Sequence, residues 1–313
     1  MTNVNRNYEN SKEVTDHRSG VLDFAAQEAL LESERKANTA WSKLKRNKTA
    51  MVGLIIIVFM CLLALLAPWL QPHDPNAIDP LNAYQKPFSP GHIFGTDEFG
   101  RDLFSRILHG GRVSLVAAIG GMTFAAVVGV LLGLIAAYAG GFIDALIMRV
   151  MDGMLSFPFV LLALILMTVL GRGLANVIIA IGISNIPSFA RVARGQVLVV
   201  KNEEYCHATR VLGASNVWLL FRHILPNILS PIIVYFTLNI AGAIITEATL
   251  SFLGMGVAPP MASWGSILKQ GKEVLVTAPH IATIGGLCIL FTVLGFNLLG
   301  DGIRDVLDPK MRK

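Results

Sequence analysis

Glu247 is a carboxylate inside a long apolar stretch of this 313-residue sequence. An ionisable group in such a stretch is costly unless it faces protein, water or a substrate. It could therefore line a path across a membrane and contact a substrate amine; the alternative is a structural hydrogen bond to a neighbouring helix or to the turn at 251–256. Asn185 and Asn239 leave a similar choice, because amides often bond helix to helix in membranes. These three residues are the candidate lining of a translocation path.

A second group of charged residues lies at 92–106, which reads HIFGTDEFGRDLFSR. Asp97 and Arg101 are four residues apart, a spacing that allows an ion pair along a helix. Thr96 or Asp97 can also cap a helix start, because short polar side chains accept hydrogen bonds from the first free N–H groups. The segment therefore predicts a capped helix start with an Asp97–Arg101 pair.

A polar, helix-forming island at 204–226 reads EYCHATRVLGASNVWLLFRHILP and lies between apolar stretches. The composition predicts one helix over 201–211, a left-handed turn at Gly213 and a second helix that ends before Pro226. Small side chains would let a partner groove approach the backbone, and apolar side chains would anchor it. The predicted docking residues are Glu204, Tyr205, His207, Ala208, Thr209, Leu212, Gly213 and Ala214. The alternative is an amphipathic interfacial helix without a partner.

The sequence lacks the pattern of a nucleotide-binding or hydrolytic site. The run GSILKQGKE at 265–273 has one residue too many between its glycines, and Glu273 stands where a magnesium-binding hydroxyl is needed. There is no HExxH motif and no Ser/His pair suited to catalysis, and the three cysteines predict neither a disulfide framework nor a metal site. We therefore predict that the chain is no enzyme, with no catalytic residue, metal site or ATPase site of its own.

The elements that must position these groups are apolar runs of roughly 20 residues, the length that a hydrocarbon layer of about 30 Å requires of a helix. They lie at 51–70, 113–138, 154–170, 175–192, 228–250 and 281–299. The composition, 53% hydrophobic and 15% charged, is too apolar for an ordinary soluble domain. The predicted fold class is all-α, an integral membrane protein with about six transmembrane helices. Pro158 and Pro187 could kink the third and fourth spans, and Gly129 and Gly133 form a small-x-x-x-small packing face.

Basic residues beside the span ends predict that both termini are cytoplasmic, because short cytoplasmic loops hold an excess of Lys and Arg. The predicted inner bases are Lys43, Lys45, Arg46, Lys48, Arg149, Arg191, Arg194, Lys201, Arg210, Arg222, Arg304, Lys310, Arg312 and Lys313. The net charge of +5 follows from this topology and requires no nucleic acid.

The predicted organisation is a cytoplasmic tail at 1–42 followed by a transmembrane domain at 43–313. The tail has no early apolar core, so it is not a secretory signal, and 20–40 has a helix-favouring composition. The domain contains outer loops at 71–112 and 251–280, the second re-entrant or on the surface, a cytoplasmic coupling loop at 193–227 and a cytoplasmic C-terminus at 301–313.

The segment GTDEFGRDLFSRIL at 95–108 resembles the GTD-x-x-GRD-x-x-SR signature of the dipeptide, oligopeptide and nickel branch of ABC-importer permeases. The residues that carry this motif are Gly95, Thr96, Asp97, Gly100, Arg101 and Asp102. The 204–226 island resembles the EAA loop of the same permeases, with departures at His207, Thr209 and His223. Further matches at 148–152, 247–256 and 297–309 extend the resemblance over nearly all of the chain from residue 43 onward.

The resemblance implies a type I ABC-importer permease, one of two related permease subunits in a bacterial cytoplasmic membrane. Its partners would be two cytoplasmic ATPases, which bind ATP and Mg²⁺, and an extracytoplasmic solute-binding protein; this chain would bind no cofactor. The expected cargo is a short peptide: a dipeptide, an oligopeptide or glutathione. A nickel chelate is the alternative within the family. From other classes, an ion-coupled secondary transporter would use Glu247, and an intramembrane enzyme would need a buried nucleophile and base.

Overall fold

The computed structural model describes residues 40–307, and every regular element in that range is a helix or helical turn, which confirms the predicted all-α class. In chain order these are α2 (Ala40–Arg46), α3 (Lys48–Leu65), α4 (Ala67–Leu70), a 3-10 turn (Pro80–Asn82), α5 (Leu103–Ala139), α6 (Gly141–Leu155), α7 (Phe159–Leu170), α8 (Leu174–Val200), α9 (Glu204–Val211), α10 (Asn216–Leu219), a π turn (Leu220–Ile224), α11 (Leu225–Phe252), α12 (Trp264–Glu273) and α13 (Pro279–Leu307). The helix expected at 20–40 lies, except for its last residue, outside the described residues, as do Lys310, Arg312 and Lys313.

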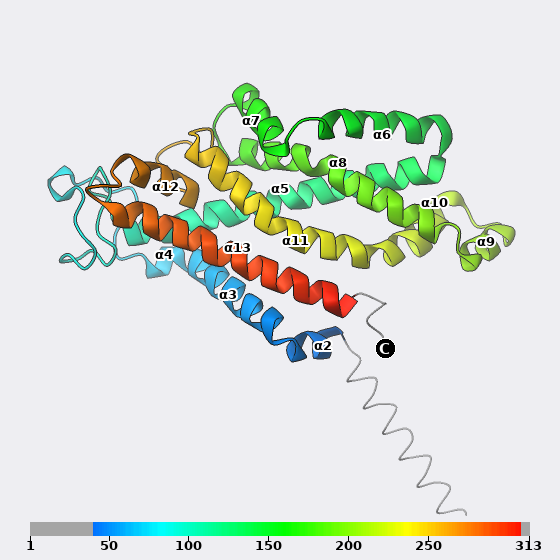
Figure 1. The fold of residues 1–313 in the computed structure, drawn as a ribbon, viewed down its shortest axis with the longest axis horizontal. Helices are drawn as coiled ribbons and strands as arrows, with labels where there is room; N and C mark the ends of the chain where they lie inside the picture. Colours follow the sequence, from blue (N-terminus) through cyan, green and yellow to red (C-terminus); the bar gives the residue numbers. More distant parts are fainter. Residues whose placement is uncertain (1–39, 308–313) are drawn as a thin grey trace, which may run out of the picture.

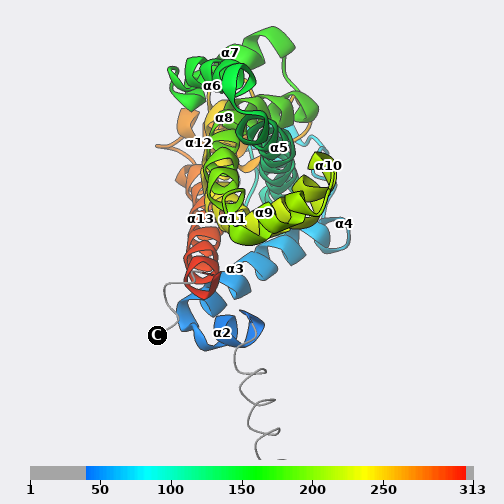
Figure 2. The same cartoon turned by 90° about the vertical axis from the view of Figure 1, so that its right-hand side faces the viewer.

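The long helices run roughly along one axis of the molecule (Figure 1). The loop at 71–102 and α12 lie at one end, and α9 lies at the other. Seen from the α9 end, α6 and α7 lie on one side of the bundle and α3 lies on the opposite side (Figure 2). The two groups of predicted functional residues, in the loop and around α9, are therefore at opposite ends of the bundle.

Five helical segments in the described range are long and apolar enough to cross a membrane: Lys48–Leu65, Leu103–Ala139, Leu174–Val200, Asn216–Phe252 and Pro279–Val306. They correspond to five of the six predicted spans. Four of those predicted ranges lie inside the observed helices, and the first, predicted to end at 70, ends at Leu65. For the sixth span, the prediction of a single helix at 154–170 is wrong, because α6 and α7 meet there at an angle of 90°. Counting the bent pair as one span gives six.

Pro158 explains this break, since it immediately precedes α7. Proline has no N–H for the helix ladder, and it pushes the residue before it toward extended conformations. With 12 residues, α7 alone is too short to cross a layer of about 30 Å. Pro187 does not have this effect, because α8 continues through it as one helix.

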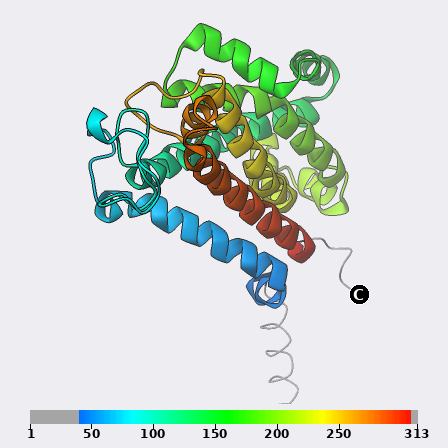
Figure 3. The same cartoon turned by 60° about the vertical axis from the view of Figure 1, so that its left-hand side comes forward.

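Small residues let the long helices approach closely. A Cβ added at Gly129 would lie 2.6 Å from the Cβ of Phe189, and one added at Gly133 would lie 2.5 Å from the carbonyl oxygen of Ala190. The predicted packing role of this glycine face is confirmed, and its partner is α8. Between α3 and α13, which run side by side in Figure 3, a Cβ at Gly53 would lie 2.7 Å from the carbonyl oxygen of Gly295.

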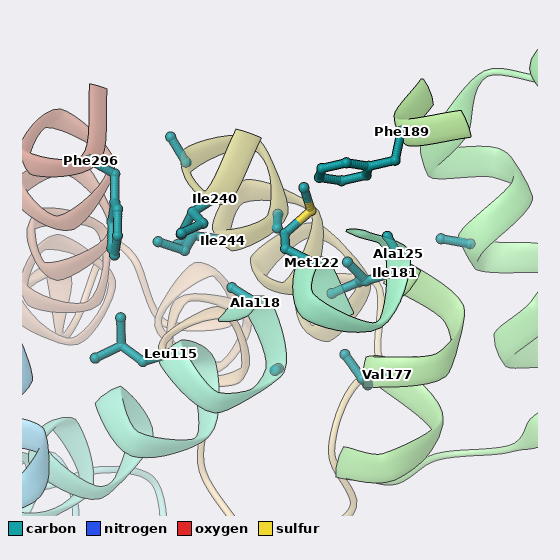
Figure 4. Packing of buried hydrophobic residues seen from close by; sticks show 14 of the residues in the cluster. Leu115, Ala118, Met122, Ala125, Val177, Ile181, Phe189, Ile240, Ile244 and Phe296 are labelled. Atoms are coloured by element: carbon teal, nitrogen blue, oxygen red, sulfur yellow. The ribbon is translucent and has the colours of Figure 1, made fainter. Parts of the chain in front are cut away.

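The buried core lies where α5, α8, α11 and α13 meet (Figure 4). Its labelled members include Ala118 and Met122 from α5, Ile181 and Phe189 from α8, Ile240 and Ile244 from α11, and Phe296 from α13. Lipid tails are as apolar as these side chains, so close van der Waals packing supplies much of the association free energy here.

The helix after Gly213 differs from its prediction. It does not end before Pro226, because α10, the π turn and α11 form one helical run over Asn216–Phe252. Pro226 falls in the first turn of α11, directly after the π turn. Hydrogen bonding changes register there, so the missing N–H of a proline is tolerated where it would otherwise break the ladder.

Candidate functional site

Asp97 is the centre of a buried charge cluster in the 71–102 loop. Its Oδ2 lies 2.7 Å from Nε of Arg101 and 3.2 Å from Nε of Arg106, and its Oδ1 accepts hydrogen bonds from the N–H groups of Phe99 and Arg101. All three charged side chains are nearly inaccessible to solvent. The predicted Asp97–Arg101 pair is confirmed, and Arg106 is a third member that sequence reasoning did not place there.

The helix cap that was predicted at Thr96 or Asp97 is instead formed by Asp102. Its Oδ2 accepts hydrogen bonds from the N–H of Ser105 at 2.8 Å and from the hydroxyl of Ser105 at 2.7 Å. The helix starts at Leu103, later than the cap prediction required and well before the expected span start at 113. Thr96 has another role. Its hydroxyl accepts a hydrogen bond from the N–H of Gln85 and so connects two segments of the loop.

The two glycines of the motif are required by close backbone contacts. Gly100 has a positive φ of 72°, and a Cβ there would lie 1.7 Å from the carbonyl oxygen of Asp79. A Cβ at Gly95 would lie 2.1 Å from the carbonyl oxygen of Gln85. The six defining residues of the GTD-x-x-GRD motif are all buried, so these residues determine the fold of the loop. Beside them, burial and the neighbouring Asp97 raise the pKa of Glu98.

A pocket lies between the 71–102 loop and the segment before α12. Arg106, His109 and Arg112 of α5 line one wall, and Met261 and Ala262 form the far wall. His109 also hydrogen-bonds the side chain of Gln71 at 2.7 Å. The two segments predicted as outer loops therefore share one surface.

Glu247 is fully buried where α5, α11 and α12 meet. It accepts hydrogen bonds from the hydroxyl of Ser114 at 2.8 Å and from that of Ser251 at 2.7 Å. The Ser114 oxygen in turn accepts the N–H of Trp264 at 3.2 Å. This geometry matches the alternative in which Glu247 makes structural hydrogen bonds. Ser114 and Trp264, the other members of this hydrogen-bond network, were not predicted from the sequence. No motif signals them, because helices distant in sequence bring them together.

Replacing Glu247 separates the two interpretations. Glu247→Ala leaves the Ser114 and Ser251 hydroxyls without their acceptor, so we expect it to lower the free energy of unfolding by about 1–3 kcal/mol. Glu247→Gln keeps one acceptor oxygen, and we expect a smaller loss. Thermal unfolding of the detergent-purified variants measures both effects. If Glu247→Gln abolishes uptake while both variants unfold like the wild type, the carboxylate serves transport.

Asn185 and Asn239 do not join helices in this structure. Each side-chain amide donates to a carbonyl of its own helix, that of Ile181 at 2.8 Å and that of Tyr235 at 2.7 Å. Of the two alternatives stated for these residues, the interhelical bond is therefore not seen among the hydrogen bonds of the described range. Within the described range no hydrogen bond connects either amide to Glu247.

The first helix predicted for the 201–215 segment is confirmed as α9, and Gly213 has the predicted left-handed backbone, with a φ of 84°. Val211 and Leu212 are each 87% exposed, and Tyr205 is 40% exposed. The remaining docking residues also line this face: Glu204, His207, Ala208 and Gly213 are exposed, and Thr209 and Ala214 are half-buried. A face with apolar, small and polar side chains is thus left uncovered by the rest of the described chain.

Several contacts attach the 201–215 segment to the ends of α5 and α8. Cys206 is buried, which raises the pKa of its thiol, and its Sγ donates to the carbonyl oxygen of Val200 at 3.3 Å. The ammonium of Lys201 donates to the carbonyl oxygen of Ala137 at 2.7 Å. The hydroxyl of Tyr138 hydrogen-bonds the side chain of Asn216. These contacts hold the 201–215 segment, and with it the exposed face of α9, against the neighbouring long helices.

Two of the predicted inner bases have acidic partners on α6. The guanidinium of Arg194 binds both carboxylate oxygens of Asp144 at 2.6 Å, and Arg191 lies 2.7 Å from Asp152. The two acids are two helical turns apart, so they face the same neighbour. Sequence reasoning missed these pairs, although the 148–152 motif already contained Asp152.

The chain matches two protein families. Residues 129–313 match the family described as binding-protein-dependent transport system inner membrane component. Residues 37–87 match the N-terminal transmembrane domain of oligopeptide transport permease C.

Similar proteins cover nearly the same length. The chain is 46% identical to the dipeptide transport system permease protein of Alkalihalophilus pseudofirmus and 45% identical to the glutathione transport system permease protein of Escherichia coli, in each case over 87% of this chain and 90% of the relative. The corresponding glutathione permease of Pectobacterium atrosepticum is 42% identical over the same shares.

A solved structure has the same fold. One chain of the MetNI methionine ABC transporter, in an inward-facing form, matches with a TM-score of 0.53 at 17% identity. The match covers 64% of this chain and 95% of that one. On its sequence, its helices and these relatives, the chain belongs to the binding-protein-dependent transport system inner membrane component family, the permeases of ABC importers.

Proposed function

We propose that this chain is a permease subunit of an ATP-driven importer of short peptides, and that α9 with its glycine turn is where a cytoplasmic ATPase binds. The observation that carries the proposal is the exposed face of α9. Leu212 and Val211 are almost fully exposed beside a left-handed glycine, and the described chain covers neither. Apolar anchors next to a small-residue surface suit a helix that inserts into a partner groove.

The topology that follows places the α9 end in the cytoplasm and the 71–102 loop and α12 on the outer side of a bacterial cytoplasmic membrane. Lys201 and Arg210 near α9 support this orientation, because short cytoplasmic loops are rich in such bases. Both termini would then be cytoplasmic. The solute-binding protein would dock on the surface shared by the two outer loops, and a second permease would complete the path.

The mechanism is alternating access. Closure of the ATPase dimer on ATP and Mg²⁺ moves α9 and, through its contacts with α5, tilts the long helices from an inward-open to an outward-open state. Peptide released by the binding protein enters between the paired permeases, and hydrolysis resets them. Nucleotide can shift this equilibrium only because the ATPases contact the two states differently.

The cargo we propose is a dipeptide, a short oligopeptide or glutathione, in line with the names of the similar permeases reported above. A nickel chelate is the second candidate, on the GTD-x-x-GRD resemblance. The binding protein, a different chain, would select among them.

Purification of this chain in mild detergent from its native host, followed by mass spectrometry of the proteins bound to it, tests the proposal. We expect two ATPases, a second permease and a solute-binding protein, whose ligand then identifies the cargo. Reproducible recovery of the folded chain alone, with uptake driven by an ion gradient, would instead support an ion-coupled carrier.

A further inference from the structure

Three potential metal ligands from separate parts of the sequence meet in the 71–102 loop. His73 follows α4, His92 lies in the middle of the loop, and Asp102 caps α5. One ring nitrogen of each histidine and one carboxylate oxygen of Asp102 lie within 4.8 Å of one another. The imidazole rings are 4.8 Å apart between centroids and tilted by 37°. Side chains that converge in this way can share one ion.

The carboxylate of Asp102 is already oriented toward the two histidines. Its Oδ2 is held by the N–H and the hydroxyl of Ser105, and its Oδ1 lies 2.9 Å from Nδ1 of His92. The backbone N–H of His73 also approaches the Ser105 hydroxyl, at 3.4 Å. Outer hydrogen bonds that fix a ligand's orientation commonly support metal sites. Ser105 therefore acts as a shared support for two of the three ligands.

The charged residues around Asp102 leave its carboxylate available to bind a metal ion. Arg101 and Arg106 pair with Asp97, and in the described range the partners of Asp102 are His92 and Ser105, with no Lys or Arg among them. Asp102 is buried, His92 is half-buried and His73 is exposed. The cluster is thus enclosed on one side and open to solvent on the other, which leaves room for an ion to arrive and for water as a further ligand.

We propose that His73, His92 and Asp102 bind a divalent transition-metal ion of the Zn²⁺ class. Imidazole nitrogen suits Zn²⁺, Cu²⁺ and Ni²⁺, whereas Mg²⁺ and Ca²⁺ prefer all-oxygen sites. Two imidazoles and a carboxylate leave a fourth position for water in a tetrahedral site. Binding replaces the His92–Asp102 hydrogen bond by two metal bonds, and the Nδ1 proton of a neutral His92 passes through water to Nε2.

Such an ion would join the beginning, the middle and the end of the loop. It would stabilise the folded state in proportion to its occupancy, since a ligand that binds only the folded protein stabilises it by mass action. The proposed site does not depend on the identity of the cargo.

The test is metal binding to the full-length chain, purified in detergent through a tag without histidine and stripped of metal. Co²⁺ is titrated with its visible absorbance as the signal, and Zn²⁺ is measured by competition with a chromophoric chelator. We expect one ion per chain and a rise in the thermal midpoint with Zn²⁺. His73→Gln and His92→Gln should each weaken binding at least 10-fold and remove the rise.

The matched control is His109→Gln, which changes a histidine of the same end of the molecule that lies outside the cluster. We expect it to bind metal like the wild type. Because His73 is exposed, His73→Gln keeps the test decisive even if His92→Gln folds poorly. Equal affinity in His73→Gln and His109→Gln, or no saturable binding by the wild type, would overturn the proposal.

Discussion

Asp97→Ala is expected to lower the free energy of unfolding by about 3–5 kcal/mol, the range found when one partner of a buried ion pair is removed. The carboxylate is fully buried and within 3.2 Å of two guanidinium groups, those of Arg101 and Arg106. Its loss leaves both cations buried without a counter-charge and frees two backbone N–H groups. We therefore expect a large drop in the thermal midpoint and in the folded yield.

Asp79→Asn is the control for this prediction. Asp79 belongs to the same loop but is exposed, and its side chain accepts a hydrogen bond from Asn82 that an asparagine oxygen can also accept. This variant should unfold like the wild type in fluorescence-monitored melting. If Asp97→Ala proves as stable as Asp79→Asn, the buried cluster does not maintain the loop.

Gly213→Trp is expected to reduce ATP-driven uptake by the assembled importer at least 10-fold while membrane insertion remains normal. Apart from its two chain neighbours, no atom of the described chain lies within 4 Å of a Cβ built at Gly213, so the first atom of a new side chain enters open space. The tryptophan side chain would project from the α9 face proposed to bind the ATPase and would keep the two surfaces apart. Uptake and ATP hydrolysis measured together in proteoliposomes should show the loss of coupling.

Gly213→Ala provides the matched variant, because Gly213 has a φ of 84°. Any residue with a Cβ carries a cost of roughly 1–2 kcal/mol in that conformation, so alanine reproduces the backbone strain without the bulk. We expect alanine to retain most of the uptake that tryptophan abolishes. Wild-type uptake by Gly213→Trp would exclude the proposed role of the turn.

The sequence predicted best those features that depend on neighbouring residues. Apolar run length identified the five long spans, and the glycine at 213 indicated where α9 would end. Local signals also failed in identifiable ways. The run at 154–170 was apolar enough for a span, but Pro158 divides it, and Pro226 did not stop a helix because the π turn before it changes the hydrogen-bond register.

The features that could not be predicted depend on contacts distant in sequence. Thr96 and Asp97 had the chemistry of a helix cap, yet Asp102 takes that role because Asp97 is engaged by two arginines. Glu247 was recognised as an unusual acid in an apolar stretch, but no motif marks its partner Ser114 on α5, or Trp264 of α12, which bonds Ser114. Pairing between helices depends on the tertiary arrangement, which a single sequence does not encode in local spacing.

The helical run Asn216–Phe252 connects the two ends of the molecule. Its 37 residues measure about 55 Å at a rise of 1.5 Å per residue. Turned by about 5° around one end, a rod of this length displaces its other end by roughly 5 Å. A lever arm of these proportions would convert a small rotation beside α9 into a displacement longer than the Ser114–Glu247 hydrogen bond. Under the proposed alternating access, either α5 and α12 travel with α11, or that bond breaks in each transport cycle.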